Sequence, residues 1–291
     1  MAKRIATAVI LAVAAALGLS SDLDLDRTAL QGARVCPHDP DQLYIPAGTF
    51  LMGSTREERE RAYELDKGVT RPYGWYESET RRNAAAGPFC IDRYLVTNGA
   101  YKRFVEHTGH PAPFISADGY RRQGFLVHSY GKVREFLWRD GLFPSGRESH
   151  PVALVSLKDA QSYCEWRGTQ MRHRYRLPTE EEWEKAARGS DGRLFPWGDR
   201  WNPDYLNSGG RFGSTTPVDR FPQGKSPYGV YDMAGNLFEW TATPWEEKSF
   251  TLKGCSWDDL PGACRAAMRH GRPPESKHIL IGFRCVSEPR S

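Results

Sequence analysis

The sequence predicts a single globular domain that mixes short strands with a few helices and contains much irregular structure. Of its 291 residues, 39% are hydrophobic, which is enough to bury a core. Helical periodicity and helix caps occur only before residue 190, whereas glycine, proline, tryptophan and short extended runs dominate the rest. The sequence contains no repeat and no second hydrophobic region, so residues 43–288 are expected to form one domain.

The first 42 residues carry a targeting signal and a polar leader. Residues 1–21 combine Lys3 and Arg4, an apolar run and small residues, which is the pattern of a secretory signal peptide. An uncleaved anchor or a core helix are the alternatives, because no clean A-x-A cleavage site is present. The predicted mature protein is periplasmic or secreted, begins with a leader at residues 22–42, and has no membrane contact after cleavage.

Short elements open the domain. Residues 43–52 are expected to form a hairpin of two strands around a Pro-Ala-Gly turn. Residues 56–65 are charged and helix-prone, and the stretch after them is expected to be a surface excursion. An extended pattern returns at residues 89–92, and Thr97 is placed to cap a helix that Gly109 ends.

The middle of the chain supplies the other helices. Residues 111–149 are rich in aromatic and basic side chains, which suits an insertion that lines a cleft, although ordinary loop packing is an alternative. Residues 152–155 predict a short apolar strand, and Ser156 is placed to cap the helix that follows. Thr179 and Glu182 form the pattern of a capping box for a further helix.

Charge and cysteine content narrow the function classes. The 40 Lys and Arg residues against 36 Asp and Glu give a net charge of +4, and the basic residues are scattered among acidic ones. This pattern gives no support to a nucleic-acid partner. The six cysteines, behind a predicted export signal, are expected to form disulfides in an oxidising compartment.

Several sequence blocks, in one order, carry a family resemblance. They are IPAGTFLMG (45–53), DRYLVTN (92–98), YCEWRG (163–168), RLPTEEEWEKAARG (176–189), FPWGD (195–199), YGVYDMAGN (228–236) and GFRC (282–285). The chain resembles the formylglycine-generating enzyme superfamily over residues 43–286. The resemblance implies an α+β class and the variant C-type-lectin-like fold, loop-rich with little regular secondary structure. Because this scaffold carries oxidases, sulfoxide synthases, accessory proteins and binding modules, the fold alone does not give the function.

The resemblance also implies a redox site, from which this sequence departs. In the sulfatase-activating members two cysteines separated by four residues bind copper(I) as thiolates. Here Asp259 stands at the first position and Cys264 at the second, and a carboxylate is a poor replacement for a soft thiolate. One hypothesis is that Cys255 and Cys264 form a displaced dithiol or redox disulfide that holds copper. The alternatives are a third structural disulfide, or one buried cysteine and one orphan.

Basic residues follow the second cysteine closely. Arg269, His270, Arg272 and His278 could face the same pocket as charge-stabilising or proton-transfer groups, or could form a solvated basic edge. The eight histidines show no metal-ligand spacing on one helix, so iron is the weaker alternative to copper. The candidate catalytic residues are Cys255, Asp259, Cys264, Arg269 and His270.

The remaining cysteines are expected to be structural. The resemblance implies a disulfide between Cys164 and Cys285. Cys36 and Cys90 are left, and each precedes or lies within an early strand, so we expect them to pair and staple the N-terminal segment.

A structural calcium site is implied as well. Its ligands would be the side chains of Asp232 and Glu239 and the carbonyl groups of Gly235 and Leu237, all hard oxygen donors. The alternative is that the two acidic residues cap turns. A second family site would begin at Asn207, but its downstream aspartate is not matched.

The favoured interpretation is a periplasmic maturation factor with an oxidative or redox role on a peptide, siderophore precursor or partner enzyme. It resembles family members associated with siderophore chromophores and nitrite reductase. The substrate, a peptide, protein or small aromatic or anionic molecule, would lie between residues 111–149 and 255–278. The alternatives are a non-catalytic paralogue that binds a protein partner, which Asp259 favours, and a sulfatase-activating cysteine oxidase.

Overall fold

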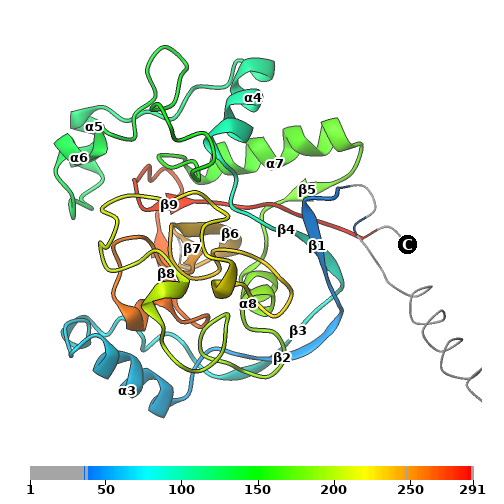
Figure 1. The fold of residues 1–291 in the computed structure, drawn as a ribbon, viewed down its shortest axis with the longest axis vertical. Coiled ribbons are helices and arrows are strands. Elements are labelled where there is room, and N and C mark those ends of the chain that lie inside the picture. The colour runs from blue at the N-terminus through cyan, green and yellow to red at the C-terminus, as the bar shows by residue number, and fades with distance from the viewer. Residues whose placement is uncertain (1–35, 37–38, 247, 290–291) are drawn as a thin grey trace, which may run out of the picture. The chain divides into compact units, whose positions relative to one another are not determined.

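The computed structural model describes residues 36, 39–246 and 248–289. The predicted signal peptide, residues 1–21, and most of the leader, residues 22–42, lie outside the described residues. The helices are α3 (Arg56–Leu65), α4 (Asn98–Thr108), α5 (Ala117–Arg122), α6 (Tyr130–Val133), α7 (Leu157–Met171) and α8 (Glu180–Arg188). The strands are β1 (Gln42–Ile45), β2 (Gly48–Met52), β3 (Arg82–Ala86), β4 (Phe89–Asp92), β5 (Tyr175–Arg176), β6 (Phe238–Pro244), β7 (Phe250–Lys253), β8 (Arg269–Arg272), β9 (Ile281–Gly282) and β10 (Val286–Ser287). These short elements, joined by long irregular segments, confirm the loop-rich α+β class (Figure 1).

Helix boundaries follow the predicted caps. Thr97, Ser156 and Thr179 precede α4, α7 and α8, and each side chain accepts a backbone hydrogen bond from the first turn. The capping box of Thr179 with Glu182 is complete, and Gly109 ends α4 in the left-handed conformation. After α8, the only helical segments in the described chain are single 3₁₀ turns. This agrees with the high glycine and proline content of that region.

The hairpin expected at residues 43–52 is wrong, although both strands exist. β1 pairs with β4, and β2 pairs with β3, so the two strands run beside the returning segment at residues 82–92 rather than beside each other. The ladders stop on both sides of Pro46 and Pro88, because proline has no N–H to continue a ladder. The result is a long two-part ribbon.

The described residues form two four-stranded sheets, with the orders β1-β4-β10-β5 and β8-β7-β6-β9, and the second lies at the centre of the described domain (Figure 1). Its buried Trp240 donates a hydrogen bond to the carbonyl oxygen of Val155, which ties β6 to the segment before α7. The strand expected at residues 152–155 is absent. Leu154 has a φ of 60°, a left-handed conformation that an extended strand cannot contain, and only Pro151 makes an isolated bridge, to Thr97.

The insertion at residues 111–149 contains α5 and α6 and is anchored to the C-terminal third. Tyr120 and Val133 belong to one hydrophobic cluster with Trp257, Ile279 and Leu280. In Figure 1 these two short helices lie at the upper left, apart from both α8 and α4. The insertion is therefore packed against the segment that carries Asp259 rather than being a free loop.

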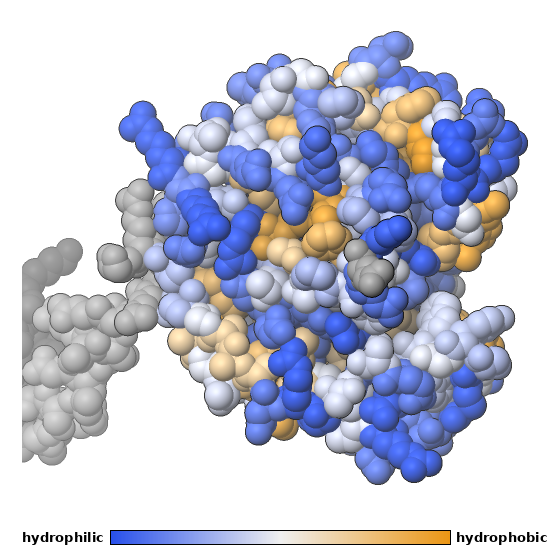
Figure 2. All heavy atoms as spheres, turned by 180° about the vertical axis from the view of Figure 1, so that it is seen from behind, coloured by the Kyte–Doolittle hydropathy of each residue, from blue (hydrophilic) through white to orange (hydrophobic). Residues whose placement is uncertain are grey.

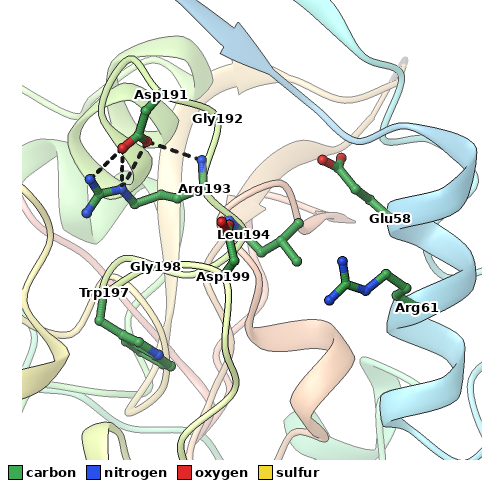
Figure 3. A pocket seen from close by; sticks show the side chains of 9 residues that line it. All are labelled: Glu58, Arg61, Asp191, Gly192, Arg193, Leu194, Trp197, Gly198 and Asp199. Atoms are coloured by element: carbon green, nitrogen blue, oxygen red, sulfur yellow. Dashed lines mark hydrogen bonds and ion pairs between the residues drawn. The ribbon is translucent and has the colours of Figure 1, made fainter.

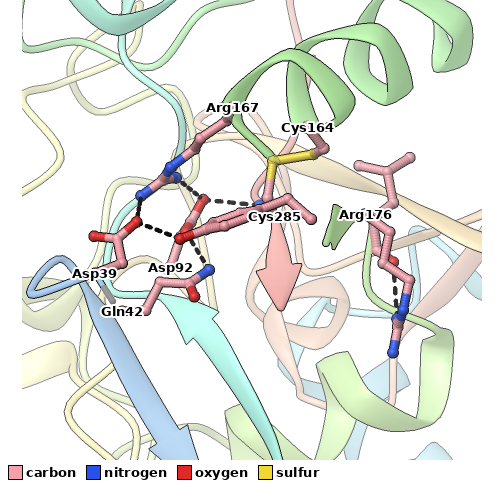
Figure 4. Close-up of a disulfide and its surroundings, with 9 residues drawn as sticks. Asp39, Gln42, Asp92, Cys164, Arg167, Arg176 and Cys285 are labelled. Atoms are coloured by element: carbon pink, nitrogen blue, oxygen red, sulfur yellow. Dashed lines mark hydrogen bonds and ion pairs between the residues drawn. A yellow bond between two sulfur atoms is a disulfide. The ribbon is translucent and has the colours of Figure 1, made fainter. Parts of the chain in front are cut away.

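All six cysteines are paired, and the two expected bridges are confirmed as Cys36–Cys90 and Cys164–Cys285. The third bridge joins Cys255 and Cys264. Beside Cys285, Arg167 contacts both Asp39 and Asp92, and the Asp92 carboxylate also accepts the Cys285 backbone N–H (Figure 4). Disulfides persist in oxidising compartments, so this pattern indicates a secreted or otherwise exported protein.

Two features of the described chain are relevant to what it could bind: the length and hydrophobicity of its helices, and the distribution of hydrophobic residues on its surface. In the described part of the chain, no helix is long and apolar enough to cross a bilayer. Seen from behind, hydrophobic residues form separate patches between charged ones (Figure 2). Patches of that kind are typical of ligand or protein contacts when they surround a cavity.

Candidate functional site

A cleft of about 200 Å³ lies between the insertion, the segment after α3 and the sheet containing β8. Its walls are mostly apolar or aromatic, and its polar groups are Asp258, Asp259, His270 and Arg272, with Thr70 at one side. The apolar walls come from Val69, Tyr73, Trp75, Phe125, Val127, Phe238, Leu252, Leu260, Met268, Leu280 and Ile281. An apolar pocket with a few convergent polar groups is the usual form of a ligand site.

Strand β8 decides which basic residues face this cleft. Successive side chains of a strand point to opposite faces, so His270 and Arg272 share one face and Arg269 has the other. His270 and Arg272 line the cleft. The Arg269 guanidinium instead lies 2.8 Å from Glu180 and stacks over the ring of Trp245. The expectation that Arg269 faces the same pocket is therefore wrong, because the pleat of β8 directs its side chain to the opposite face.

His278 does not reach the cleft either. Its ring stacks on Tyr120 and contacts Phe125, and its Nδ1 accepts the backbone N–H of Leu280. Burial, together with the nearby His128 and Arg272, lowers the pKa of His278 to about 3. His278 is therefore neutral near pH 7. It holds the insertion in place through its contacts with Tyr120 and Phe125 and does not line the cleft.

The polar groups of the cleft have shifted proton affinities. Burial lowers the pKa of His270 to about 4, with a smaller contribution from Arg272, so its imidazole is neutral near pH 7. Burial raises the pKa of Asp259 to about 6, although hydrogen bonds from Ser256 oppose the shift. Burial also lowers the pKa of Arg272 to about 10, which leaves it charged near neutrality. Such perturbed groups in an apolar cleft mark a candidate site.

Asp259 is held by its own loop. The Ser256 backbone N–H donates to the Asp259 carboxylate at 2.8 Å, and the Ser256 hydroxyl donates to the same oxygen. The neighbouring Asp258 lies 3.0 Å from His128 of the insertion. Asp259 thus supports the turn after Cys255 while it lines the cleft.

The cysteines expected to be catalytic form a closed bridge. Cys255 and Cys264 are both fully buried, and neither lines the cleft. The Gly235 backbone N–H donates to the Cys255 Sγ at 3.0 Å. The family's copper(I) site uses two thiolates, and this oxidised pair supplies none, while Asp259 offers a hard oxygen. The donor set of the folded chain does not fit the copper site that the family implies.

The residues expected to bind calcium are close together but partly engaged. Glu239 accepts two hydrogen bonds from the buried Arg284, at 2.7 and 2.8 Å. Asp232 accepts one from the Asn236 side chain, and burial raises the pKa of Asp232 to about 7. Among the described residues no cluster of three His, Cys, Asp or Glu side chains could hold a metal.

Backbone oxygens complete the calcium test. No hydrogen bond within the described chain reaches the carbonyl oxygens of Gly235 or Leu237. The buried Oδ1 of Asn207 likewise has no partner there, and its Nδ2 donates to Ser214. These oxygens suit calcium in type, so Asp232, the two carbonyl groups and the Glu239 carboxylate that Arg284 also contacts form a donor set that fits a hard cation.

The segment after α3 is the part of the site that the sequence did not reveal. It was expected to be a surface excursion, yet it supplies Val69, Tyr73 and Trp75 to the cleft. Two buried contacts attach it to the disulfide loop. Asp66 accepts the Gly262 backbone N–H at 2.6 Å, and Glu79 forms two hydrogen bonds with Arg265.

Gly262 shows how close this attachment is. A Cβ at residue 262 would lie 2.5 Å from the carbonyl oxygen of Ala62, so only glycine fits. The aromatic residues Tyr73 and Trp75 were the sequence feature that could have suggested a contribution to the cleft. They form no motif that would indicate which part of the chain they pack against.

A larger cavity of about 480 Å³ lies elsewhere, between α3 and the loop at residues 191–199 (Figure 3). Its lining is polar, and the Asp191 carboxylate in it is paired with Arg193. Glu58, also in the lining, is engaged by Arg81. Since these charges neutralise one another, this cavity is a weaker candidate than the apolar cleft.

Comparison with known proteins agrees with the family resemblance of the sequence blocks. A sequence model of the sulfatase-modifying factor enzyme 1-like domain matches residues 29–289. The inactive Cα-formylglycine-generating enzyme 2 of Mus musculus is 32% identical over 86% of this chain and 86% of its own length. The formylglycine-generating enzyme of Mus musculus is 31% identical over 84% of this chain and 74% of its own.

Solved structures agree with this assignment. PvdO from Pseudomonas aeruginosa superposes with a TM-score of 0.66 at 25% identity, covering 87% of this chain and 96% of that structure. This similarity confirms the fold that the sequence blocks implied. The chain belongs to the family of sulfatase-modifying factor enzyme 1-like domains, which includes the formylglycine-generating enzymes.

Proposed function

We propose that the protein is an exported maturation accessory of the formylglycine-generating type, located in the periplasm, that holds a peptide or a small aromatic anion in the cleft without thiol-based oxidation. One observation carries the proposal: the cysteine at the second copper-ligand position is closed in a buried bridge, and Asp259 replaces the first. A thiolate is the required copper(I) ligand, and neither position offers one.

The cleft supports binding independently of the cysteines. Aromatic and aliphatic walls give contact area, and Arg272 supplies one positive charge. The relative named an inactive formylglycine-generating enzyme 2 is consistent with a member of the family that has lost cysteine oxidation. Buried bridges of this kind stabilise a loop rather than react, because a buried disulfide sulfur is inaccessible to the thiolates that would reduce it.

The test compares conversion with binding. A cysteine-containing sulfatase peptide is incubated with purified protein, copper(I) and oxygen, and the product is read by mass spectrometry beside an active formylglycine-generating enzyme. We expect no aldehyde product from this protein, and saturable binding of cleft-directed aromatic peptides by fluorescence anisotropy. Aldehyde formation above the level of copper alone would refute the proposal.

A second candidate, oxidative maturation of a substrate in the cleft, is favoured by the trio Asp259, His270 and Arg272. Their shifted pKa values would allow proton transfer to or from a bound aromatic group. The measurement is oxygen consumption with candidate precursors in the wild type and in Asp259→Asn. Equal consumption by both proteins would contradict a role for Asp259.

We also propose calcium as a structural ion bound by Asp232 with the carbonyl groups of Gly235 and Leu237. Calcium would raise the melting temperature of the wild type, because a ligand that binds only the folded state stabilises it. Asp232→Ala would abolish that shift, whereas Asp204→Ala, on an exposed turn, would leave it unchanged. No shift in the wild type would refute the site.

A further inference from the structure

Arg272 is a positive charge in an apolar cleft whose closest acidic influence, the Asp259 carboxylate, acts on it without forming an ion pair. It forms no ion pair with any described residue, and its buried Nε atom has no hydrogen-bond partner among them. The guanidinium carbon lies 3.7 Å from the centre of the Phe125 ring, which fixes it against the cleft wall. A partly buried arginine with unused donors is a site for an anion, since its planar fork matches a carboxylate.

The other polar groups of the cleft do not satisfy this charge. The Asp259 carboxylate accepts hydrogen bonds from Ser256, the Asp258 carboxylate lies 3.0 Å from His128, and neither forms an ion pair with Arg272. His270 contacts the rings of Phe238 and Trp75. The anion that fits Arg272 is therefore expected to come from a ligand.

The size of the cleft limits what can enter. A volume of about 200 Å³ is smaller than the pocket of a drug-sized molecule, which is roughly 300 Å³ or more, and suits one large side chain. Around it, hydrophobic side chains remain exposed: Val69 by 59%, Tyr73 by 74% and Val127 by 57%. Exposed apolar groups around a small pocket suit a ligand that continues beyond it.

We propose that the cleft binds the C-terminal residue of a peptide, with a large aromatic side chain in the pocket and the free α-carboxylate paired with Arg272. This inference rests on the proposed function and names its ligand. Within a peptide, only the C-terminal residue can carry both an aromatic side chain and a carboxylate on one Cα atom. An internal aromatic residue lacks the anion, and an internal acidic residue lacks the apolar bulk. The preceding residues lie over Val69, Tyr73 and Val127.

The test uses two fluorescent peptides, dye-Gly-Ser-Gly-Ser-Phe with a free carboxylate and the same peptide with a C-terminal amide. Anisotropy titration of the full chain is expected to give an affinity about tenfold or more weaker for the amide, the loss of a hydrogen bond to a charged group. Arg272→Gln removes this preference, and Arg272→Lys retains part of it because the charge remains.

Arg269→Gln is the matched control. It changes the same charge on the same strand but on the opposite face, so the preference for the free carboxylate is expected to remain. Far-ultraviolet circular dichroism and melting temperature establish that each variant is folded before titration.

The outcomes separate this inference from the proposed function. Equal affinity of the free and amidated peptides refutes the carboxylate contact and leaves cleft binding intact. Binding of 3-phenylpropanoate as tight as that of the peptide refutes a peptide ligand in favour of a small acid. If no peptide and no small acid binds the folded protein, both proposals are wrong.

Discussion

At the scale of the residue, Asp259 is the side chain that most clearly distinguishes this chain from a cysteine oxidase. It stands at a copper-ligand position, lines the cleft, and accepts two hydrogen bonds from Ser256. A carboxylate cannot replace a thiolate toward copper(I), but it can hold the loop that carries Cys264. Asp259 therefore both stabilises the loop after Cys255 and adds a polar group to the cleft.

The proton affinity of Asp259 gives a prediction with a definite sign. Burial raises its pKa from 3.8 to about 6, so the folded state keeps a proton that the unfolded state loses. Stability from this residue is full below about pH 4 and is lost as pH rises through 6, with a cost of up to about 3 kcal/mol. Asp259→Asn is expected to be more stable than the wild type at pH 7.5 but not at pH 4.

Urea unfolding of both proteins at the two pH values measures this difference. Asp258→Asn is the control for a charge lost one residue earlier, where the carboxylate contacts His128. A stability difference between wild type and Asp259→Asn that is the same at both pH values would contradict the raised pKa.

At the scale of the element, α8 shows how one cap supports a buried charge network. The helix carries Glu184, whose carboxylate contacts Arg188 and Lys253, and all three are fully or almost fully buried. Arg188 also donates to the carbonyl oxygens of Leu51 and Gly53 in and after β2. Buried ion pairs need precise geometry, so the start of α8 matters beyond one hydrogen bond.

Thr179→Ala is expected to lower the free energy of unfolding by about 1 kcal/mol, because the Glu182 backbone N–H loses its side-chain acceptor. Thr179→Ser keeps an oxygen at the same place and should be close to the wild type. Urea unfolding gives both values. A Thr179→Ala protein as stable as the wild type, or a Thr179→Ser protein as destabilised as Thr179→Ala, would show that the cap has no such role.

Elements also show what the sequence could and could not predict. Caps at Thr97, Ser156 and Thr179 act within one turn, and the helices they predict are confirmed. The pairing of β1 with β4 depends on the path of a segment 44 to 50 residues away, which no local pattern encodes. Leu154 has an unusual conformation set by its neighbours, and hydropathy alone could not show it.

Likewise, only part of the candidate site could be predicted from the sequence. The resemblance implied Asp259 and Cys264, and proximity in sequence suggested His270. Asp259 and His270 both line the cleft, which lies where residues 111–149 meet residues 255–278, whereas Cys264 does not. Which face of β8 each basic residue takes required the register of the sheet. The contribution of Tyr73 and Trp75 required the contact of Asp66 with Gly262.

At the scale of the whole molecule, the three disulfides are expected to differ in their effect on stability. They join residues separated by 121, 54 and 9 positions for Cys164–Cys285, Cys36–Cys90 and Cys255–Cys264. In the chain-entropy model, removing them by paired alanine substitution costs about 5, 4 and 3 kcal/mol respectively.

Urea unfolding of the three paired variants in the absence of reductant tests this order. The short bridge is expected to cost least in free energy because it closes a small loop, even though both of its cysteines are fully buried. An unfolding free energy for the Cys255→Ala/Cys264→Ala protein lower than that of the Cys164→Ala/Cys285→Ala protein would contradict the order.

The most direct test of binding without thiol chemistry is alkylation of the native exported protein, purified without reductant and analysed by peptide mass spectrometry. We predict no alkylated cysteine before or after addition of copper(I), and a peptide pair joined through Cys255 and Cys264. Alkylation of Cys264 in the folded native protein, prevented by copper(I), would contradict the closed bridge and restore a thiolate metal site.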